Sequence, residues 1–196
     1  MSVPLVFVWP YGLFYWAVHA LAFVPESLRF SRLERAAPRP IHDRGSLRLL
    51  TALWAYCGAA LALAFVAPWA TLRTGRLAQF WTGLGLLAVG ALLRRHCFRM
   101  LGGHFTPAVN VRPGQPIVER GAYRWVRHPS YTGGAMMFLG FGAALTNWLS
   151  LAVVAAGVAV AYTVRIRTEE QAMLAVLGEP YRSYMRRTRR LVPLVF

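Results

Sequence analysis

Residues 129–164 contain no acidic or basic side chain, and this run of 36 residues constrains the fold more than any other feature of the chain. A membrane-spanning helix needs about 17 to 25 apolar residues. A polar pair, Thr146 and Asn147, divides the run into two apolar segments. The run therefore predicts a helical hairpin that crosses a bilayer and returns, so that the segments before and after it emerge on the same side of the membrane.

Three other long uncharged runs precede the hairpin, at residues 1–25, 49–72 and 77–93. Together they give five candidate spans. The third run has only 17 residues, and we expect Arg94 and Arg95 to reach from its end to the membrane interface and so extend it. Between the first two runs, the proline-containing segment 26–46 is expected to be a loop with at most a short interfacial helix.

The expected fold class is an all-α integral membrane protein with about five transmembrane helices, a C-terminal helical hairpin and a cytoplasmic loop before it. Residues 1–196 are expected to form one domain. Its expected parts are three N-terminal spans in residues 1–98, a cytoplasmic loop at 99–130, the hairpin at 131–164, and a cytoplasmic helix and tail at 165–196.

The arginines indicate which side of the membrane each loop occupies. All 22 basic residues are arginines, and 20 of them lie in residues 29–48, 94–127 and 165–190, whereas Arg73 and Arg76 lie in another connection. Cytoplasmic loops of membrane proteins carry the excess of basic residues. We therefore expect a multi-pass protein of a bacterial inner (cytoplasmic) membrane, with its N-terminus outside and its C-terminus in the cytoplasm.

The formal charge of +15 does not require a nucleic-acid partner, because arginines at span ends meet anionic lipid headgroups. No zinc-finger spacing or basic repeat is present, so nucleic acid is not expected as a partner and membrane lipids are. Cys57 and Cys97 are expected to be reduced packing residues. His96 and His104 lie near Cys97 without a known ligand spacing, so no metal site is expected. The sequence leaves the oligomeric state open.

Glycine and proline interrupt the segment 102–130 eight times, which excludes a long helix there. His128 precedes a proline and is therefore biased towards an extended backbone. Free backbone groups of residues 115–118, with the rings of Tyr123 and Tyr131, are suited to hold a flat heterocycle. The alternative is that Tyr123, Trp125 and Tyr131 are aromatic residues of the membrane interface.

Arg165 and Glu169 lie four residues apart on the helix expected to leave the last span, so they share a face. Glu170 lies about 100 degrees further round. Charges at the edge of the hydrocarbon are costly unless they are paired or functional. The alternative is a surface salt bridge, worth about 0.3 to 0.5 kcal/mol. Tyr181 and Tyr184 continue the helical spacing, and the tail is expected to close the site while its arginines face headgroups or solvent, namely Arg182, Arg186, Arg187, Arg189 and Arg190.

Two motifs in this order resemble the isoprenylcysteine carboxyl methyltransferase family and, within it, a bacterial-type member. The first is Gly121-x-Tyr123-x-x-x-Arg127-His128-Pro129-Ser130-Tyr131, and the second is Arg165-x-x-x-Glu169-Glu170 followed by Leu174, Gly178-x-x-Tyr181-x-x-Tyr184 and Pro193. The resemblance covers residues 102–193, the C-terminal half. The N-terminal half is similar only in having spans.

The resemblance implies an all-helical membrane bundle in which S-adenosylmethionine enters from the cytoplasm. Arg165 and Glu169 are the implied catalytic residues, with Arg165 facing the methyl acceptor. Two positions depart from the animal enzymes, which have glutamine where this chain has Asn110 and histidine where it has Gln115. The implied cofactor-binding residues are Asn110, Gln115, Pro116, Ile117, Val118, Tyr123, His128, Pro129, Ser130, Tyr131 and Glu169.

The expected activity is methyl transfer from S-adenosylmethionine to a lipophilic small molecule or lipid-like acceptor, a carboxylate, phenol or thiol, at the cytoplasmic membrane face. The identity of the acceptor stays open. Two other classes also stay open. One is a membrane reductase of the sterol-reductase type that uses NADPH, and the other is a non-enzymatic membrane scaffold.

Overall fold

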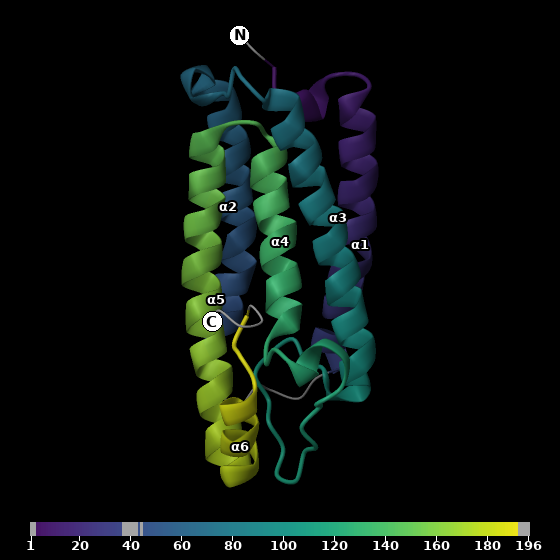
Figure 1. The fold of residues 1–196 in the computed structure, drawn as a ribbon, viewed down its shortest axis with the longest axis vertical. Coiled ribbons are helices and arrows are strands. Elements are labelled where there is room, and N and C mark those ends of the chain that lie inside the picture. The colour runs from purple at the N-terminus through teal and green to yellow at the C-terminus, as the bar shows by residue number, and fades with distance from the viewer. Residues whose placement is uncertain (1–2, 37–42, 44, 192–196) are drawn as a thin grey trace.

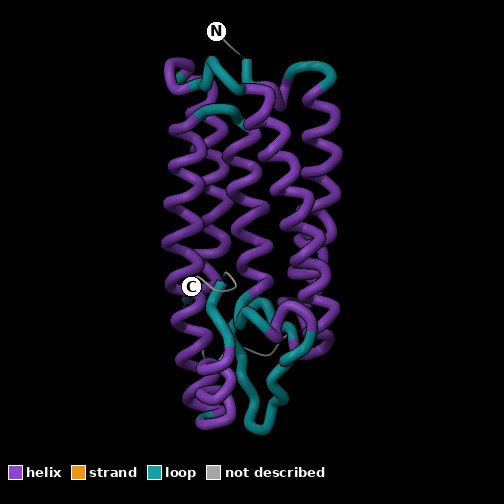
Figure 2. The backbone as a smooth tube through the Cα atoms, viewed as in Figure 1, coloured by secondary structure: helices purple, strands orange, loops and turns teal. Residues whose placement is uncertain are grey.

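Five long helices lie side by side in the computed structural model, which describes residues 3–36, 43 and 45–191 (Figure 1). Within these residues no β-strand forms, and two isolated β-bridges are the only strand-like pairs (Figure 2). The helices are α1 (Tyr11–Ala36), α2 (Ser46–Val66), α3 (Arg76–Leu101), α4 (Pro129–Ala144), α5 (Trp148–Leu177) and the short α6 (Glu179–Arg187). Single 3-10 turns are η1 (Leu5–Phe7), η2 (Pro68–Ala70), η3 (Gly102–His104) and η4 (Gly121–Arg124).

The uncharged run forms the predicted hairpin of α4 and α5, and its turn lies at the predicted polar pair. The side chain of Asn147 caps α5, because its Oδ1 accepts from the Ser150 N–H at 3.0 Å. Its Nδ2 donates to the Ala67 carbonyl at 2.9 Å and so ties the turn to the end of α2. The segments on either side of the hairpin meet at one end of the bundle (Figure 1). We call this end, which holds residues 102–128 and 165–191, the motif end.

Three helices, α2, α3 and α5, are long and apolar enough to cross a membrane, counting only the described part of the chain. The protein is therefore an integral membrane protein. The other two of the five expected spans do not meet both conditions. Helix α4 has only 16 residues, and α1 has 26 residues but no stretch that is apolar enough.

The expectation of a loop over residues 26–46 is wrong for its first part. Helix α1 passes through Pro25 and ends at Ala36. Contacts with α3 and the segment after it hold this second half, since the Phe30 ring packs on Phe98 and Phe105 with ring centroids 6.0 and 5.4 Å apart. Glu26 adds an ion pair to Arg94. Residues 37–42 and 44 of the expected loop lie outside the described residues.

Arg94 does not extend the third span by reaching the interface, as the sequence suggested. Helix α3 itself continues to Leu101, and the Arg94 side chain is buried. Its Nε donates to Glu26 Oε1 at 2.7 Å and its Nη1 to the Ser130 carbonyl at 2.8 Å. Burial of this cation is tolerated because it is paired and hydrogen-bonded. Arg94 therefore joins α1, α3 and the first turn of α4.

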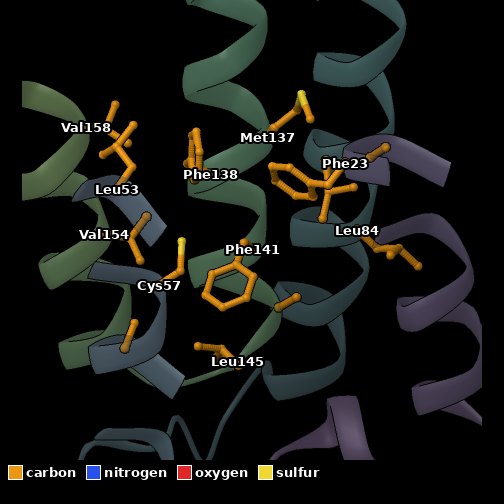
Figure 3. Close-up of a cluster of buried hydrophobic side chains, with 14 of the residues drawn as sticks. Phe23, Leu53, Cys57, Leu84, Met137, Phe138, Phe141, Leu145, Val154 and Val158 are labelled. Atoms are coloured by element: carbon orange, nitrogen blue, oxygen red, sulfur yellow. The ribbon is translucent and has the colours of Figure 1, made fainter. Parts of the chain in front are cut away.

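Helix α4 occupies the middle of the bundle, and its side chains fill the core (Figure 3). Figure 3 shows Phe138 and Phe141 of α4 among residues of the neighbouring helices. Cys57 and Cys97 are free and buried, which agrees with a packing role. The other buried residues in this view include Phe23 of α1, Leu53 of α2, Leu84 of α3, and Val154 and Val158 of α5.

Glycines allow α3 and α4 to pack with their backbones almost in contact. A Cβ atom at Gly90 would lie 2.5 Å from the Gly133 carbonyl oxygen and 2.8 Å from the Met137 nitrogen. A Cβ at Gly140 would lie 2.6 Å from the Gly83 carbonyl oxygen. Backbone atoms cannot yield as a flexible side chain can. Glycine at these positions therefore sets the distance between the helices and, through it, where α4 places the first motif.

We predict that Gly90→Ala destabilises the protein by about 1 to 3 kcal/mol, because the added methyl group forces the two backbones apart. Gly85→Ala is the matched control, since Gly85 lies on the same helix with no neighbouring atom within 4 Å of its virtual Cβ. Melting of both variants in detergent measures the difference. Equal melting temperatures would show that the helices can separate without cost.

Candidate functional site

The motif end contains a cavity of about 1050 Å³ of unfilled space, its open mouth included. The walls come from the segment 105–118, from the start of α4, and from α5 and α6. Phe30, Leu50 and Arg94 add walls from α1, α2 and α3. The predicted site residues that line the cavity are Asn110, Gln115, Pro116, Ile117, Val118, Tyr123, His128, Ser130, Tyr131, Arg165 and Glu169.

Pro129 is the one predicted site residue that does not line the cavity. It is buried at the first position of α4, where a proline fits because the first turn of a helix needs no N–H at that point. Its role is to start the helix that carries Ser130 and Tyr131.

The wall formed by residues 105–118 has no helix, as its glycines and prolines predicted (Figure 2). The Gln115 side chain turns back on this segment, where its Oε1 accepts from the Arg112 N–H at 3.3 Å. Within the described chain, the backbone groups of residues 116–119 form no hydrogen bond with other residues. These groups are therefore free to bind a ligand.

Arg165 lies at the centre of the site and is only 3% exposed. Its Nε donates to Tyr131 Oη at 3.0 Å, and its Nη1 donates to Ser46 Oγ at 2.8 Å and to Asp43 Oδ1. Its Nη2 donates to the Pro107 carbonyl at 2.6 Å. Four of the five guanidinium N–H groups thus have partners from α2, α4 and the two loops.

Glu169 does not pair with Arg165, although the two lie one helical turn apart. Its Oε2 accepts from Tyr131 Oη at 2.7 Å, so the tyrosine hydroxyl connects the two charged residues. No ion pair joins Arg165 and Glu169 among the described residues. The surface salt bridge that the spacing left open is therefore wrong for this pair.

The aromatic residues of the first motif divide between the site and the surface. Tyr123 and Tyr131 are buried at the cavity wall, so they are not aromatic residues of the membrane interface. Trp125 is 62% exposed and fits that alternative. The Tyr123 hydroxyl oxygen is buried with no hydrogen-bond partner in the described structure. A buried polar atom without a partner at a cavity wall is a candidate contact for a ligand.

Glu170 is the centre of a second charged cluster that the sequence did not predict. Its Oε1 lies 3.1 Å from Arg127 Nε and 3.3 Å from His128 Nε2. Arg190 donates to Oε2 through Nη2 at 2.9 Å. The expectation that Arg190 faces headgroups or solvent is therefore wrong, because a buried carboxylate attracts the guanidinium. His128 lines the cavity, but its Nε2 faces Glu170.

The chain after α6 pairs with the first motif along residues 125–128. The Arg127 N–H donates to the Arg189 carbonyl at 2.7 Å, and the His128 N–H donates to the Arg190 carbonyl at 3.0 Å. Arg189 returns a bond from its N–H to the Trp125 carbonyl at 3.0 Å. Together with Glu170, these bonds hold the tail against the segment that carries His128.

The sequence patterns also did not predict a role for Asp43, although it is the main acidic partner of Arg165. It is buried beside the start of α2. Burial opposes its ionisation, but N–H groups of Leu47 and Val109 and the Arg165 guanidinium outweigh that effect, so the pKa of the Asp43 carboxyl lies below its ordinary value. One signal was available in the sequence. The chain has only 7 acidic residues for 22 basic ones, so each acidic residue between arginines is a candidate partner for a buried cation.

Within the described residues, fold and site together define an all-helical integral membrane protein with a pocket at one end of its bundle. The sequence profile of the isoprenylcysteine carboxyl methyltransferase (ICMT) family matches residues 83–175, which include the first motif and the second as far as Leu174. This region of the chain is therefore similar to that family, as the motifs predicted.

Two curated relatives illustrate the range of the similarity. The Protein-S-isoprenylcysteine O-methyltransferase of Schizosaccharomyces pombe is 29% identical over 58% of this chain and 49% of its own length. The Methanethiol S-methyltransferase of Mycobacterium tuberculosis is 30% identical over 62% of this chain and 49% of its own length. The chain thus spans about half the length of each of these relatives.

A solved structure shares the fold. The eukaryotic intramembrane Ras methyltransferase ICMT aligns with a TM-score of 0.56 and 22% identity, over 75% of this chain and 51% of that chain. At this identity the likeness concerns the arrangement of helices. It supports the expected all-helical membrane fold.

We predict that Glu170→Gln destabilises the protein by about 3 to 5 kcal/mol, because it removes a buried charge that pairs with Arg127 and Arg190. Glu179→Gln is the control, since Glu179 pairs with Arg182 and Arg186 at a 65% exposed position, where such pairs contribute about 0 to 1 kcal/mol. Thermal melting in detergent compares the two variants. Similar small shifts would mean that the cluster does not hold the tail in place.

Proposed function

We propose that this protein transfers a methyl group from S-adenosylmethionine to a lipophilic acceptor, a carboxylate, phenol or thiol, at the membrane face that carries the motif end. The observation that carries the proposal is that one cavity within the region similar to the family is lined by residues of both motifs. They are Tyr123, Arg127, His128, Ser130 and Tyr131 of the first motif and Arg165 and Glu169 of the second. The enzymatic names of the two relatives support the reaction class.

The cavity suits S-adenosylmethionine in the groups that it offers. The free backbone of residues 116–119 offers donors and acceptors to a flat heterocycle with a polar edge. The unpartnered hydroxyl of Tyr123 adds one more polar group. The cofactor supplies an electrophilic methyl group when bound. The chain has to bind it, orient it and exclude water from it.

Charge divides the labour between the two proposed catalytic residues. Glu169 presents a carboxylate that suits an ammonium group or ribose hydroxyls of the cofactor, and Tyr131 holds this carboxylate in place. Arg165 has one N–H group on Nη2 without a partner in the described structure. We assign that group to the methyl acceptor, because a guanidinium has no reason to approach a sulfonium cation.

The acceptor is proposed to be lipophilic because the cavity reaches the transmembrane helices. Phe30 of α1, Leu50 of α2 and Leu101 at the end of α3 line it. The two relatives are named for acceptors as different as an isoprenylcysteine group and methanethiol. The proposal therefore covers a class of acceptors rather than one compound.

Calorimetry and a transfer assay test this function. Purified protein in lipid nanodiscs should bind S-adenosylmethionine and not NADPH. With a cofactor that carries a labelled methyl group, label should appear on one of three probes, an S-prenylated cysteine carboxylate, a hydrophobic phenol or methanethiol. Binding of NADPH alone would identify a reductase, and binding of neither cofactor would favour the scaffold.

Arg165→Ala and Glu169→Gln are predicted to fail in different ways. Glu169→Gln should weaken cofactor binding about tenfold, a loss of 1.4 kcal/mol. Arg165→Ala should leave cofactor affinity within about threefold but abolish most turnover, because it affects the acceptor. Exposed Arg167 on the same helix is the matched control, and Arg167→Ala should behave as the unmodified protein. Equal small effects of both substitutions would contradict the assignment.

We also propose that the motif end faces the cytoplasm of a bacterial cell, in its inner membrane. The basis is the distribution of arginines in the sequence, since 20 lie in residues 29–48, 94–127 and 165–190, and only Arg73 and Arg76 lie in the connection between α2 and α3. In a variant without Cys57 and Cys97, a cysteine at position 73 should react with a membrane-impermeant reagent from outside the cell. A cysteine at position 120 should react only after the membrane is opened. The reverse pattern would invert the proposed orientation.

A further inference from the structure

Asp43 binds four donors that come from three separate parts of the chain. Its Oδ1 accepts from Ser46 Oγ at 3.0 Å, from the Val109 N–H at 3.2 Å and from Arg165 Nη1. Its Oδ2 accepts from the Leu47 N–H at 3.0 Å. The carboxylate therefore joins the start of α2, the wall segment 105–118 and helix α5.

The position of Asp43 makes it part of the support of the cavity rather than of its surface. Asp43 itself does not line the cavity, but Val109 and Arg165, which it binds, do. Arg165 Nη2 binds the Pro107 carbonyl, so the pair holds the wall at two backbone groups two residues apart. Val109 and Val111 pack in turn on Ala172 of α5. The wall is thus fixed on both its polar and its apolar side.

We propose that Asp43 is a positioning residue for the methyltransferase site: it fixes the wall at Val109, which determines cofactor affinity, and it fixes the orientation of Arg165 towards the acceptor. This inference rests on the proposed function. Asp43 touches neither the cofactor nor the acceptor and acts through the groups that it binds. The orientation of Arg165 thus depends on a residue that lies 122 positions before it in the sequence. Asp43 lies outside the region that matches the family.

Two measurements on ligand-free and cofactor-loaded protein test the role of Asp43. Hydrogen exchange without ligand should show faster exchange in residues 107–111 for Asp43→Ala, by at least tenfold, with α3 and α4 unchanged. Calorimetry should show S-adenosylmethionine binding at least tenfold weaker. Arg165→Ala should affect affinity less than Asp43→Ala, because Asp43 still holds Val109 in that variant.

Asp43→Asn guards against a failure to fold, since an amide keeps the size of the side chain and one acceptor oxygen. It should shift exchange and affinity in the same direction as Asp43→Ala, by a smaller factor. Glu34→Gln is the matched control, because Glu34 is an exposed carboxylate in the last turn of α1. This substitution should leave both measurements unchanged.

Three results would overturn the inference. Unchanged exchange in residues 107–111 would show that Asp43 does not hold the wall. Faster exchange with unchanged cofactor affinity would show that the wall does not determine binding. Faster exchange throughout α3 and α4 would reduce Asp43 to a general contribution to stability. If the unmodified protein binds no S-adenosylmethionine, the proposed function fails, and exchange alone still decides whether Asp43 anchors the wall.

Discussion

Burial of Arg165 is the constraint on which the arrangement of the site depends. An arginine that is 3% exposed at the edge of a membrane bundle must find partners for its charge and its donors. These partners come from Asp43, Ser46, Pro107 and Tyr131, which no single helix could supply. Satisfying one guanidinium therefore brings together α2, the cavity wall, α4 and α5. Tyr131 extends the connection to Glu169.

The bilayer supplies the second constraint, because backbone groups in hydrocarbon must be satisfied within helices. The irregular backbone of residues 105–118 lies at the motif end, where it can leave polar groups free for a ligand (Figure 2). Helix α5 runs for 30 residues from Trp148 to Leu177 and carries Arg165, Glu169 and Glu170 at this end. Close packing of α3 and α4 through glycines places the first motif opposite them.

Sequence patterns predicted the features that depend on local order along the chain. The uncharged run predicted the hairpin, and the glycines and prolines predicted the open wall. The resemblance to the family implied eleven residues that line the cavity. Pairing of charges was not predictable in this way. Tertiary packing brings together charged residues that lie 20 to 122 positions apart, and no periodicity in the sequence indicates such pairs. The pairs are Asp43 with Arg165, Glu26 with Arg94, and Glu170 with Arg127 and Arg190. Pro25 favoured a loop after the first span, but the helix continues through it, because contacts between α1 and α3 stabilise the second half of α1.

The most direct test of the central claim, that the cavity at the motif end holds the cofactor, is an experimental structure of the protein in lipid with S-adenosylmethionine bound. The account predicts ligand density in contact with the backbone of residues 116–119 and with Glu169, and a hydrogen bond to the Tyr123 hydroxyl. Density at another place on the protein, with this cavity filled by side chains, would contradict it.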